Sequence, residues 1–315
     1  MKIALKWQIQ QIRKKKGLKM KIAIIGAGKW GSALYNALSE KNSCVITSRT
    51  PRNIPNFVSI DEALDCEMIV LVIAAQQTAS WLETNFVNKN QKILVASKGI
   101  DAKSGKFLNE IFEKHINREN LAYLSGPSFA SEVIQKLPCA VVINSTNDSV
   151  ASEFANLFPD YMKTYTSSDV IGAEVCGAYK NVIAIASGIC DGLKLGNNAR
   201  ASLIARGLVE ITRFGKFFGA QDETFIGLSG VGDLFLTASS ELSRNYRVGL
   251  GLAQGKSKSE ILSELGEVAE GVFTAEAIVN IAKTHQIYTP IANEVFAILN
   301  GKNVKISLSD LLRKK

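Results

Sequence analysis

Three glycines near the start of the chain have the GxGxxG spacing: Gly26, Gly28 and Gly31. They follow the apolar run KIAIIG, which predicts a strand, and they precede a predicted helix over residues 32–40. In such a unit the first glycine permits a tight turn, the second lets a pyrophosphate approach the backbone, and the third lets helix and strand pack closely. The helix N-terminus adds free N–H groups for the phosphates. A purely structural turn is the alternative, but this context predicts dinucleotide binding.

The end of the next predicted strand, residues 44–47, indicates which dinucleotide binds. This strand leads into Ser48-Arg49-Thr50. An NAD-selective site usually has Asp or Glu here to accept hydrogen bonds from the ribose, whereas Arg can accommodate a 2′-phosphate. Because no acid is present, we expect NADP to be usable, with NAD as the other candidate. The alternative is that Arg49 only stacks on the adenine or lies in solvent.

Lys180 is the first candidate for proton transfer. It lies in AEVCGAYKNVIAIASGI, a predicted helix that is otherwise nearly all apolar or small, and no carboxylate lies within one helical turn of it. Burial disfavours the charged ammonium and lowers its pKa, which makes the amine a usable proton donor and acceptor. The alternative is a surface lysine that extends its ammonium to water. Apolar residues surround the whole helix, which favours the active role.

Asp233 is the second candidate for proton chemistry, in the apolar stretch GVGDLFLT. Carboxylates are rarely buried without a partner, so we expect a sequence-distant cation beside it, and Lys180 is the obvious one. Asp233 is also placed to cap a helix that begins at Leu234, and the two roles are compatible.

Three further groups suit an anionic substrate such as a phosphate ester. Lys98 ends a predicted strand in ASKG, at the end of a parallel sheet where ligands collect. Ser128 follows another predicted strand in SGPSFA, and Ser243-Arg244-Asn245 offers a hydroxyl, a guanidinium fork and an amide in succession. Each group alone is more often structural, but their joint occurrence predicts a phosphate site.

Six short apolar runs before about Thr166 must position these residues: KIAIIG, CVIT, MIVLVIA, KILVAS, LAYLSG and AVVIN. Their continuous β-branched character predicts a mostly parallel sheet with helices on both faces. Beyond this region the predicted elements are helices, at residues 169–190, 199–218, 257–265 and 272–284. The predicted fold class is therefore α/β, with an N-terminal Rossmann-type sheet and a C-terminal all-helical domain.

We expect three segments along the chain. Residues 1–19 are a basic extension outside the fold, residues 20–167 a dinucleotide-binding Rossmann domain, and residues 168–315 a helical substrate-binding domain. The extension lacks the apolar core of a signal peptide, and Met20 follows it directly, which suggests an upstream start or an added segment. A weak surface-binding peptide is the alternative.

The composition argues against several classes of protein. Residues 1–19 carry seven of the eight net positive charges, so the rest of the chain is nearly neutral and is not expected to bind nucleic acid. The five cysteines lie far apart without CxxC spacing and only two histidines are present, which predicts no metal site and a reducing, cytoplasmic location. No run approaches the roughly 18 uninterrupted apolar residues of a membrane span, so no stable membrane insertion is expected.

From Met20 onward the chain resembles the bacterial-type NAD(P)-dependent glycerol-3-phosphate dehydrogenases, in the segments GAGKWGSAL, SKG, SGPSFA, GAYKNVIAIASGICDGLKLGNNARASLIARGL, GVGDLFLT, SRNYRVG and EVAEGV. The long block around Lys180 and the SRN triplet are specific, whereas GxGxxG is shared with many enzymes. The resemblance implies reversible hydride transfer between NAD(P)H and dihydroxyacetone phosphate, which gives sn-glycerol 3-phosphate for glycerophospholipid synthesis. The family pattern does not require residues 1–19.

The resemblance also implies roles for individual residues. Lys180 would be the proton donor and acceptor, with Asp233 near it. The substrate would be held by Lys98, Gly126, Ser128, Lys180, Asp233, Ser243, Arg244 and Asn245. The cofactor would contact the three motif glycines (Gly26, Gly28, Gly31) and Lys29, Trp30, Arg49, Lys98, Ala130, Arg244, Val268 and Glu270. A homodimer is a further expectation.

Two other functions stay open at the level of sequence. A β-hydroxyacid dehydrogenase also joins a Rossmann domain to a helical one through a lysine-bearing helix, but it would need a carboxylate clamp, whereas SRN with Lys98 looks like a phosphate clamp. A redox-sensing NAD(P)-binding module would need no proton-transfer group, and the apolar settings of Lys180 and Asp233 argue against it.

Overall fold

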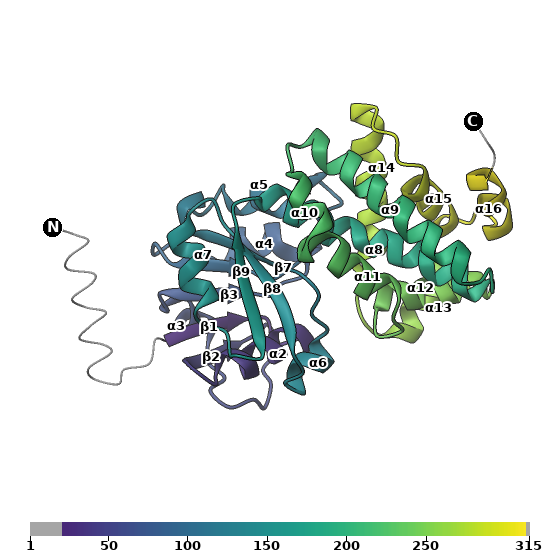
Figure 1. Cartoon of the computed structure of the whole chain (residues 1–315). Helices are drawn as coiled ribbons and strands as arrows, with labels where there is room; N and C mark the ends of the chain where they lie inside the picture. The colour runs from purple at the N-terminus through teal and green to yellow at the C-terminus, as the bar shows by residue number, and fades with distance from the viewer. Residues whose placement is uncertain (1–20, 313–315) are drawn as a thin grey trace.

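The computed structural model describes residues 21–312, so the expected basic extension, residues 1–19, lies outside the described residues. Figure 1 shows two bodies along this part of the chain, a sheet flanked by helices and a bundle of helices. The last strand of the sheet ends at Ser167, and the long helix that follows begins at Val170. Both halves of the predicted fold class are confirmed.

The first body, the sheet body, contains a seven-stranded sheet in the order β2-β1-β3-β4-β7-β8-β9. Its strands are β1 (Lys21–Ile25), β2 (Ser43–Thr47), β3 (Met68–Leu71), β4 (Lys92–Val95), β7 (Leu121–Ser125), β8 (Cys139–Asn144) and β9 (Met162–Ser167). Every neighbouring pair in this sheet is parallel except β7 and β8, as far as residues 21–312 show. Each of the six predicted apolar runs forms a strand. The edge strand β9 was not predicted, because its sequence MKTYTS is polar.

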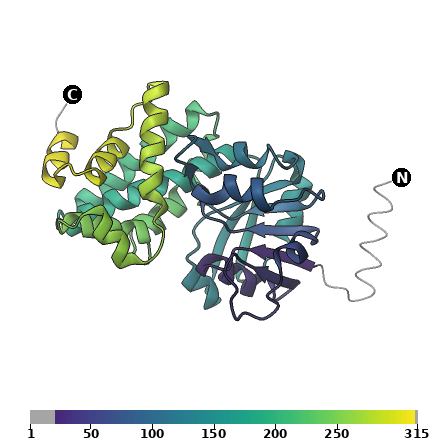
Figure 2. The ribbon, with the colours of Figure 1, turned by 180° about the vertical axis from the view of Figure 1, so that it is seen from behind.

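Successive side chains of the strands feed two apolar layers, one on each face of the sheet. Ile24 of β1 packs in one cluster with Leu34 of α2 (Lys29–Leu38), and its neighbour Ile25 packs in another with Leu64 of α3 (Ile60–Leu64). Figure 2 shows the face of the sheet that Figure 1 turns away from the viewer, also covered by helices. The remaining elements of this body are α2 (Lys29–Leu38), α3 (Ile60–Leu64), α4 (Ala75–Asn85), β5 (Ile100–Asp101), β6 (Lys106–Phe107), α5 (Leu108–Phe112), η1 (Arg118–Asn120), α6 (Ala130–Ile134) and α7 (Asp148–Ala155).

The second body, the helical body, is arranged around α8 (Val170–Gly192), which is buried along almost its whole length. By length and composition α8 alone among the described helices could cross a membrane, but 94% of its most apolar window is buried inside the fold, as in the core helix of a globular protein. The other elements are α9 (Asn197–Phe217), α10 (Asp222–Ile226), the π-helix η2 (Leu228–Gly232), α11 (Asp233–Ala238), α12 (Arg244–Ala253), α13 (Lys258–Leu265), α14 (Glu270–His285), α15 (Pro290–Leu299) and α16 (Val304–Leu312). Residues 168–312 contain no strand, as predicted.

Helices α8 and α12 cross with their backbones in contact, and two glycines make this possible. A Cβ added to Gly188 would lie 2.0 Å from the carbonyl oxygen of Tyr246, and a Cβ added to Gly249 would lie 2.1 Å from that of Ile185. No side chain fits at either position without moving a backbone. The crossing therefore fixes α12 against α8.

Candidate active site

Two lysines and one aspartate from distant parts of the chain form a buried ion cluster. The Lys180 ammonium donates to Oδ1 of Asp233 at 2.6 Å, and the Lys98 ammonium donates to Oδ2 at 2.7 Å. Lys98 also donates to the carbonyl oxygen of Gly126 at 3.2 Å. The Lys180 side chain is 10% exposed and that of Asp233 only 1%. The structure thus brings Lys180 beside Asp233, as the sequence predicted, and adds Lys98 to the pair.

The charges of this cluster follow from its burial. Burial lowers the pKa of Lys180 to about 8, the Asp233 carboxylate opposes that change, and the nearby Lys98 reinforces it. Burial alone would raise the pKa of Asp233, but Lys180 and Lys98 outweigh burial and hold that pKa below its ordinary value. Lys180 is therefore charged near neutral pH and close to the point at which it releases its proton. An amine in this state is suited to general acid–base chemistry.

A π-helical turn places Asp233 in the cluster. The turn η2 ends at Gly232, and α11 begins at Asp233 itself with no side-chain cap, so the expected capping role of Asp233 is wrong. The π turn requires Gly230, where an added Cβ would lie 2.1 Å from the carbonyl oxygen of Phe225. Single π turns inside helices occur often at functional sites. This one leaves the carboxylate free for the two lysines.

The π turn is tied to the sheet by a chain of buried hydrogen bonds. The hydroxyls of Ser229 and Ser125 lie 2.6 Å apart, and the Asn144 amide donates to Ser125 at 2.8 Å. Lys98 reaches the cluster from the end of β4 by laying its aliphatic stem over Gly177, 3.3 Å from an ideal Cβ position. The cluster therefore lies where the carboxyl ends of the strands meet the helical body.

Two residues of this site were not predicted. Thr237 accepts a hydrogen bond from Lys180 at 3.0 Å and donates to the carbonyl oxygen of Asp233 at 2.7 Å. Asn181 accepts from the amide of Asn245 at 2.9 Å. The spacing of four residues between Asp233 and Thr237 was a usable signal, because such residues share a helix face.

The glycine-rich turn has the geometry that each of its three glycines predicts. Gly26 has a φ of +114°, and a Cβ there would lie 2.3 Å from the carbonyl oxygen of Val72. A Cβ on Gly31 would lie 1.7 Å from the carbonyl oxygen of Gly26, whereas one on Gly28 would meet no atom within 4 Å. Helix α2 begins at Lys29 and has no side-chain cap. Open space at Gly28 beside uncapped N–H groups fits the phosphates of a dinucleotide.

The other residues expected at the cofactor come from several elements of both bodies. Trp30 donates its indole N–H to the carbonyl oxygen of Ala96 at 3.1 Å, and Arg49 is exposed at the end of β2. Ala130 begins α6, and Val268 is 45% exposed in the turn before α14. Glu270 is largely buried; burial raises its pKa, and its Oε2 has no hydrogen-bond partner among residues 21–312.

Some of the residues expected to hold the substrate already form hydrogen bonds within the protein, and others are exposed to solvent. Ser243 is buried and accepts from the N–H of Tyr246 as the cap of α12, and Asn245 is buried and accepts from the N–H of Gly271. Ser128 donates to the carbonyl oxygen of Gly126 at 3.3 Å. The Arg244 side chain is 45% exposed at the start of α12, which makes its guanidinium the most accessible of these groups to an anion.

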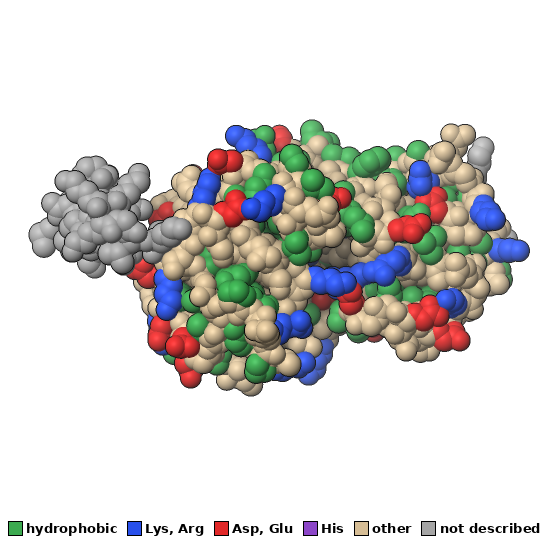
Figure 3. All heavy atoms as spheres, turned by 90° about the horizontal axis from the view of Figure 1, so that it is seen from below, with side chains coloured by type: hydrophobic (Ala, Val, Ile, Leu, Met, Phe, Trp, Pro, Cys, Tyr) green, Lys and Arg blue, Asp and Glu red, His purple; other side chains and the backbone are tan. Residues whose placement is uncertain are grey.

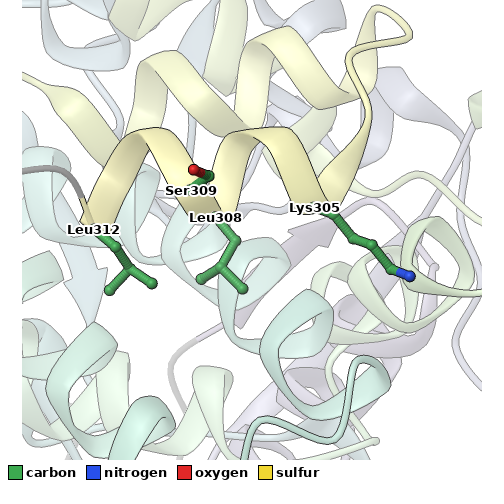
Figure 4. Close-up of a pocket in the computed structure, with 4 residues that line it drawn as sticks. All are labelled: Lys305, Leu308, Ser309 and Leu312. Atoms are coloured by element: carbon green, nitrogen blue, oxygen red, sulfur yellow. The ribbon is translucent and has the colours of Figure 1, made fainter.

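A separate open hollow of about 410 Å³ lies on α16 (Figure 4), at the end of the helical body far from the sheet (Figure 1). It is lined by Lys305, Leu308, Ser309 and Leu312. One lysine and no acid give it no proton-transfer pair. Residues 21–312 also contain no group of three or more His, Cys, Asp or Glu that could hold a metal ion.

Comparison with known proteins assigns both bodies to one family. Residues 46–151 match the profile of the NAD-dependent glycerol-3-phosphate dehydrogenase N-terminus, and residues 169–309 match that of its C-terminus. The chain is 63% identical to the glycerol-3-phosphate dehydrogenase [NAD(P)+] of Campylobacter lari, over 94% of this chain and 99% of the relative. It is 62% identical to the enzyme of that name from Sulfurimonas denitrificans, over 93% and 99%.

A solved structure supports the same assignment. The glycerol-3-phosphate dehydrogenase of Coxiella burnetii superimposes with a TM-score of 0.87 at 32% identity, over 94% of this chain and 99% of that one. A D-mandelate dehydrogenase solved with NADH has a TM-score of 0.61 at 15% identity, which shows a shared fold and no more.

Proposed function

Because the chain belongs to the NAD-dependent glycerol-3-phosphate dehydrogenase family, we propose that its buried Lys180–Asp233–Lys98 cluster is the proton-transfer site of the reaction. The enzyme is an NAD(P)-dependent oxidoreductase that interconverts dihydroxyacetone phosphate and sn-glycerol 3-phosphate, a precursor of glycerophospholipids. The single observation that carries the proposed mechanism is the Lys180 ammonium, nearly dehydrated and held at 2.6 Å from Asp233.

The proposed chemistry divides between cofactor and protein. When bound, NAD(P)H supplies a hydride to the carbonyl carbon of dihydroxyacetone phosphate and takes it back in the reverse direction. Lys180 gives its proton to the carbonyl oxygen as the alkoxide forms, so that a C–H and an O–H bond replace the C=O π bond. Asp233 keeps Lys180 charged until that moment and holds it in place with Thr237. Neutral Lys180 regains a proton from water after the product leaves.

The proposed binding residues lie on both bodies. The turn at Gly26, Gly28 and Gly31 would hold the cofactor pyrophosphate at the N-terminus of α2, with Trp30, Ala130, Val268 and Glu270 around it. Arg244 would bind the substrate phosphate, and Lys98 with Gly126 would lie beside the carbonyl. Ser243 and Asn245 would shape the start of α12, because their own polar groups are already bonded.

The division of labour follows the two bodies. We propose residues 20–167 as the dinucleotide-binding domain, because the glycine-rich turn lies there, and residues 168–315 as the substrate-binding domain, because they carry Lys180, Asp233 and Arg244. Within residues 21–312 the five cysteines form no disulfide with one another, which supports a reducing, cytoplasmic location. Large exposed apolar side chains such as Ile226 and Phe235 support a homodimer, and the burial of α8 argues against membrane insertion.

Substitution of Lys180 tests the proposal. Lys180→Ala should lower kcat for dihydroxyacetone phosphate reduction by about 10²- to 10⁴-fold, the usual contribution of general acid catalysis. Binding of NADPH, measured by fluorescence titration, should stay near the wild-type value, since Lys180 belongs to the helical body and the glycine-rich turn to the sheet body. Lys180→Arg should not restore turnover, because a guanidinium does not release its proton. A Lys180→Ala enzyme with more than about a tenth of wild-type kcat would assign proton transfer to another group.

A further inference from the structure

Glu267 is an acidic side chain that joins the two bodies through ion pairs, beside the glycine-rich turn. Its Oε1 lies 2.5 Å from the Lys29 ammonium at the start of α2, and its Oε2 lies 3.5 Å from Nη1 of Arg244 on α12. Lys29 belongs to the sheet body, while Arg244 and Glu267 belong to the helical body. Figure 3 shows Lys and Arg side chains gathered on this face where the two bodies meet, with acidic side chains next to them.

The carboxylate is charged and surrounded by cations. The hydrogen bond from Lys29 holds the pKa of Glu267 below its ordinary value, against a weaker effect of burial, and the charges of Lys29, Arg244 and Arg247 act in the same direction as that bond. Arg247 lies one helical turn after Arg244 on α12. Its Nε is buried without a hydrogen-bond partner among residues 21–312. The three cations therefore outnumber the two carboxylates that act on them, because Glu270 also interacts with Arg244, and one donor of Arg247 has no partner in the described part of the chain.

The backbone around Glu267 is a short turn between two helices. Gly266 ends α13 in the left-handed conformation, with a φ of +60°, and α14 begins at Glu270. The next side chain, Val268, is 45% exposed. Three residues thus connect Gly266 to α14. They hold the carboxylate over cations that come from two other elements.

We propose that Glu267 is an internal counter-ion that occupies the cations of the ligand site, so that it sets the affinity of the enzyme for its phosphate-bearing cofactor and substrate. The inference rests on the proposed assignment of Lys29 and Arg244 to those anions. A carboxylate and a phosphate compete for the same N–H donors and repel each other. Each phosphate that binds must therefore displace Glu267 from Lys29 or Arg244.

Solvent screening limits how strongly Glu267 can change the affinity for the cofactor. The Lys29 side chain is 77% exposed and that of Arg244 45%, so both ion pairs are screened by water. Ion pairs of this kind change an equilibrium by a factor of about two to five. Removing the charge of Glu267 should therefore strengthen cofactor binding by about that factor, an improvement that the loss of an ordinary ligand contact cannot produce.

The test compares two charge-neutralising substitutions. Glu267→Gln should lower the Kd for NADPH, measured by fluorescence titration, at least twofold, and Glu267→Ala should act in the same direction. The control is Glu264→Gln, which removes the same charge from α13, where Glu264 pairs with Lys256 at 2.6 Å, and it should leave the Kd unchanged. Any smaller decrease, an increase, or an equal change in Glu264→Gln overturns the proposal. Thermal melting of each variant checks that it is folded.

A third variant separates this inference from the function on which it rests. Arg244→Ala should raise the KM for dihydroxyacetone phosphate at least tenfold. Suppose that Arg244→Ala raises this KM while Glu267→Gln changes neither the NADPH Kd nor the KM. The assignment of Arg244 to the substrate phosphate then stands, and the counter-ion inference for Glu267 fails. If Arg244→Ala leaves the KM unchanged, the assignment of Arg244 fails, and the NADPH titration of Glu267→Gln still decides the inference through Lys29.

Discussion

Asp233→Asn should change the pH dependence of the enzyme in a way that depends on the direction of the reaction. The substitution keeps the shape of the side chain but removes the charge that lies 2.6 Å from Lys180. Two opposite charges about 4 Å apart stabilise each other by about 4 kcal/mol at an effective dielectric constant of about 20. Loss of that energy moves the pKa of Lys180 well below its value of about 8, in the direction in which burial and Lys98 already move it.

The consequence for catalysis follows from the sign of this change. In the proposed mechanism the reduction of dihydroxyacetone phosphate needs charged Lys180, so its rate should fall as the pH rises through the pKa of that residue. At pH 7 most variant molecules would then carry neutral Lys180, so kcat for reduction should fall at least about tenfold, and it should rise by about tenfold for each pH unit of acidification above the lowered pKa. Oxidation of sn-glycerol 3-phosphate needs neutral Lys180 and should be affected less.

The assay is the initial rate of NADPH oxidation or NADP reduction at saturating substrate, for wild type and variant across the pH range in which both stay folded. Saturating substrate makes kcat report the ionisation of the enzyme–substrate complex. An equal loss in both directions, independent of pH, would refute the reasoning. Asp233 would then position groups without controlling the charge of Lys180.

Two further predictions concern cofactor choice and helix packing. Arg49→Asp should shift the NADPH/NADH ratio of kcat/KM about tenfold toward NADH. The substitution replaces a cation at the end of β2 with a carboxylate that repels a 2′-phosphate. A ratio unchanged within about twofold would show that Arg49 does not contact the 2′-phosphate. Gly249→Ala should lower the free energy of unfolding by on the order of 1–3 kcal/mol, because the new Cβ would lie 2.1 Å from the carbonyl oxygen of Ile185. Denaturant titration measures the loss of stability. A free energy of unfolding equal to that of wild type would mean that α8 and α12 can move apart to accept the new Cβ at no cost.

The sheet and the glycine-rich turn could be predicted because short-range patterns specify them. A buried parallel strand such as β3 is apolar throughout, and the roles of Gly26, Gly28 and Gly31 depend only on a strand before them and a helix after. Strand β9 carries no such signal. It pairs only with β8 at the edge of the sheet, and its polar side chains resemble a loop.

The sequence was sufficient to identify Lys180 and Asp233 as residues of the site, but not to predict all of the contacts between the site residues. Unusual burial identified Lys180 and Asp233 from sequence, since a charged group in an apolar stretch needs a partner. That Lys98 shares the same carboxylate depends on how β4 meets the helical body, which no local pattern records. The π turn before Asp233 was missed for a similar reason, because a glycine-rich stretch does not specify which helical hydrogen-bonding pattern it adopts.

The glycine crossing of α8 and α12 has a consequence for any opening of the enzyme. Since the two backbones touch at Gly188 and Gly249, α8 and α12 form a single rigid unit. Lys180 on α8 and Arg244 on α12 therefore keep their separation. Lys98 rides on the sheet instead. A hinge motion between the bodies would therefore leave Lys180 and Arg244 at an unchanged separation and would draw Lys98 away from Asp233. Each opening would divide the three-charge cluster into a pair and a lone lysine, and each closure would rebuild it around a new substrate.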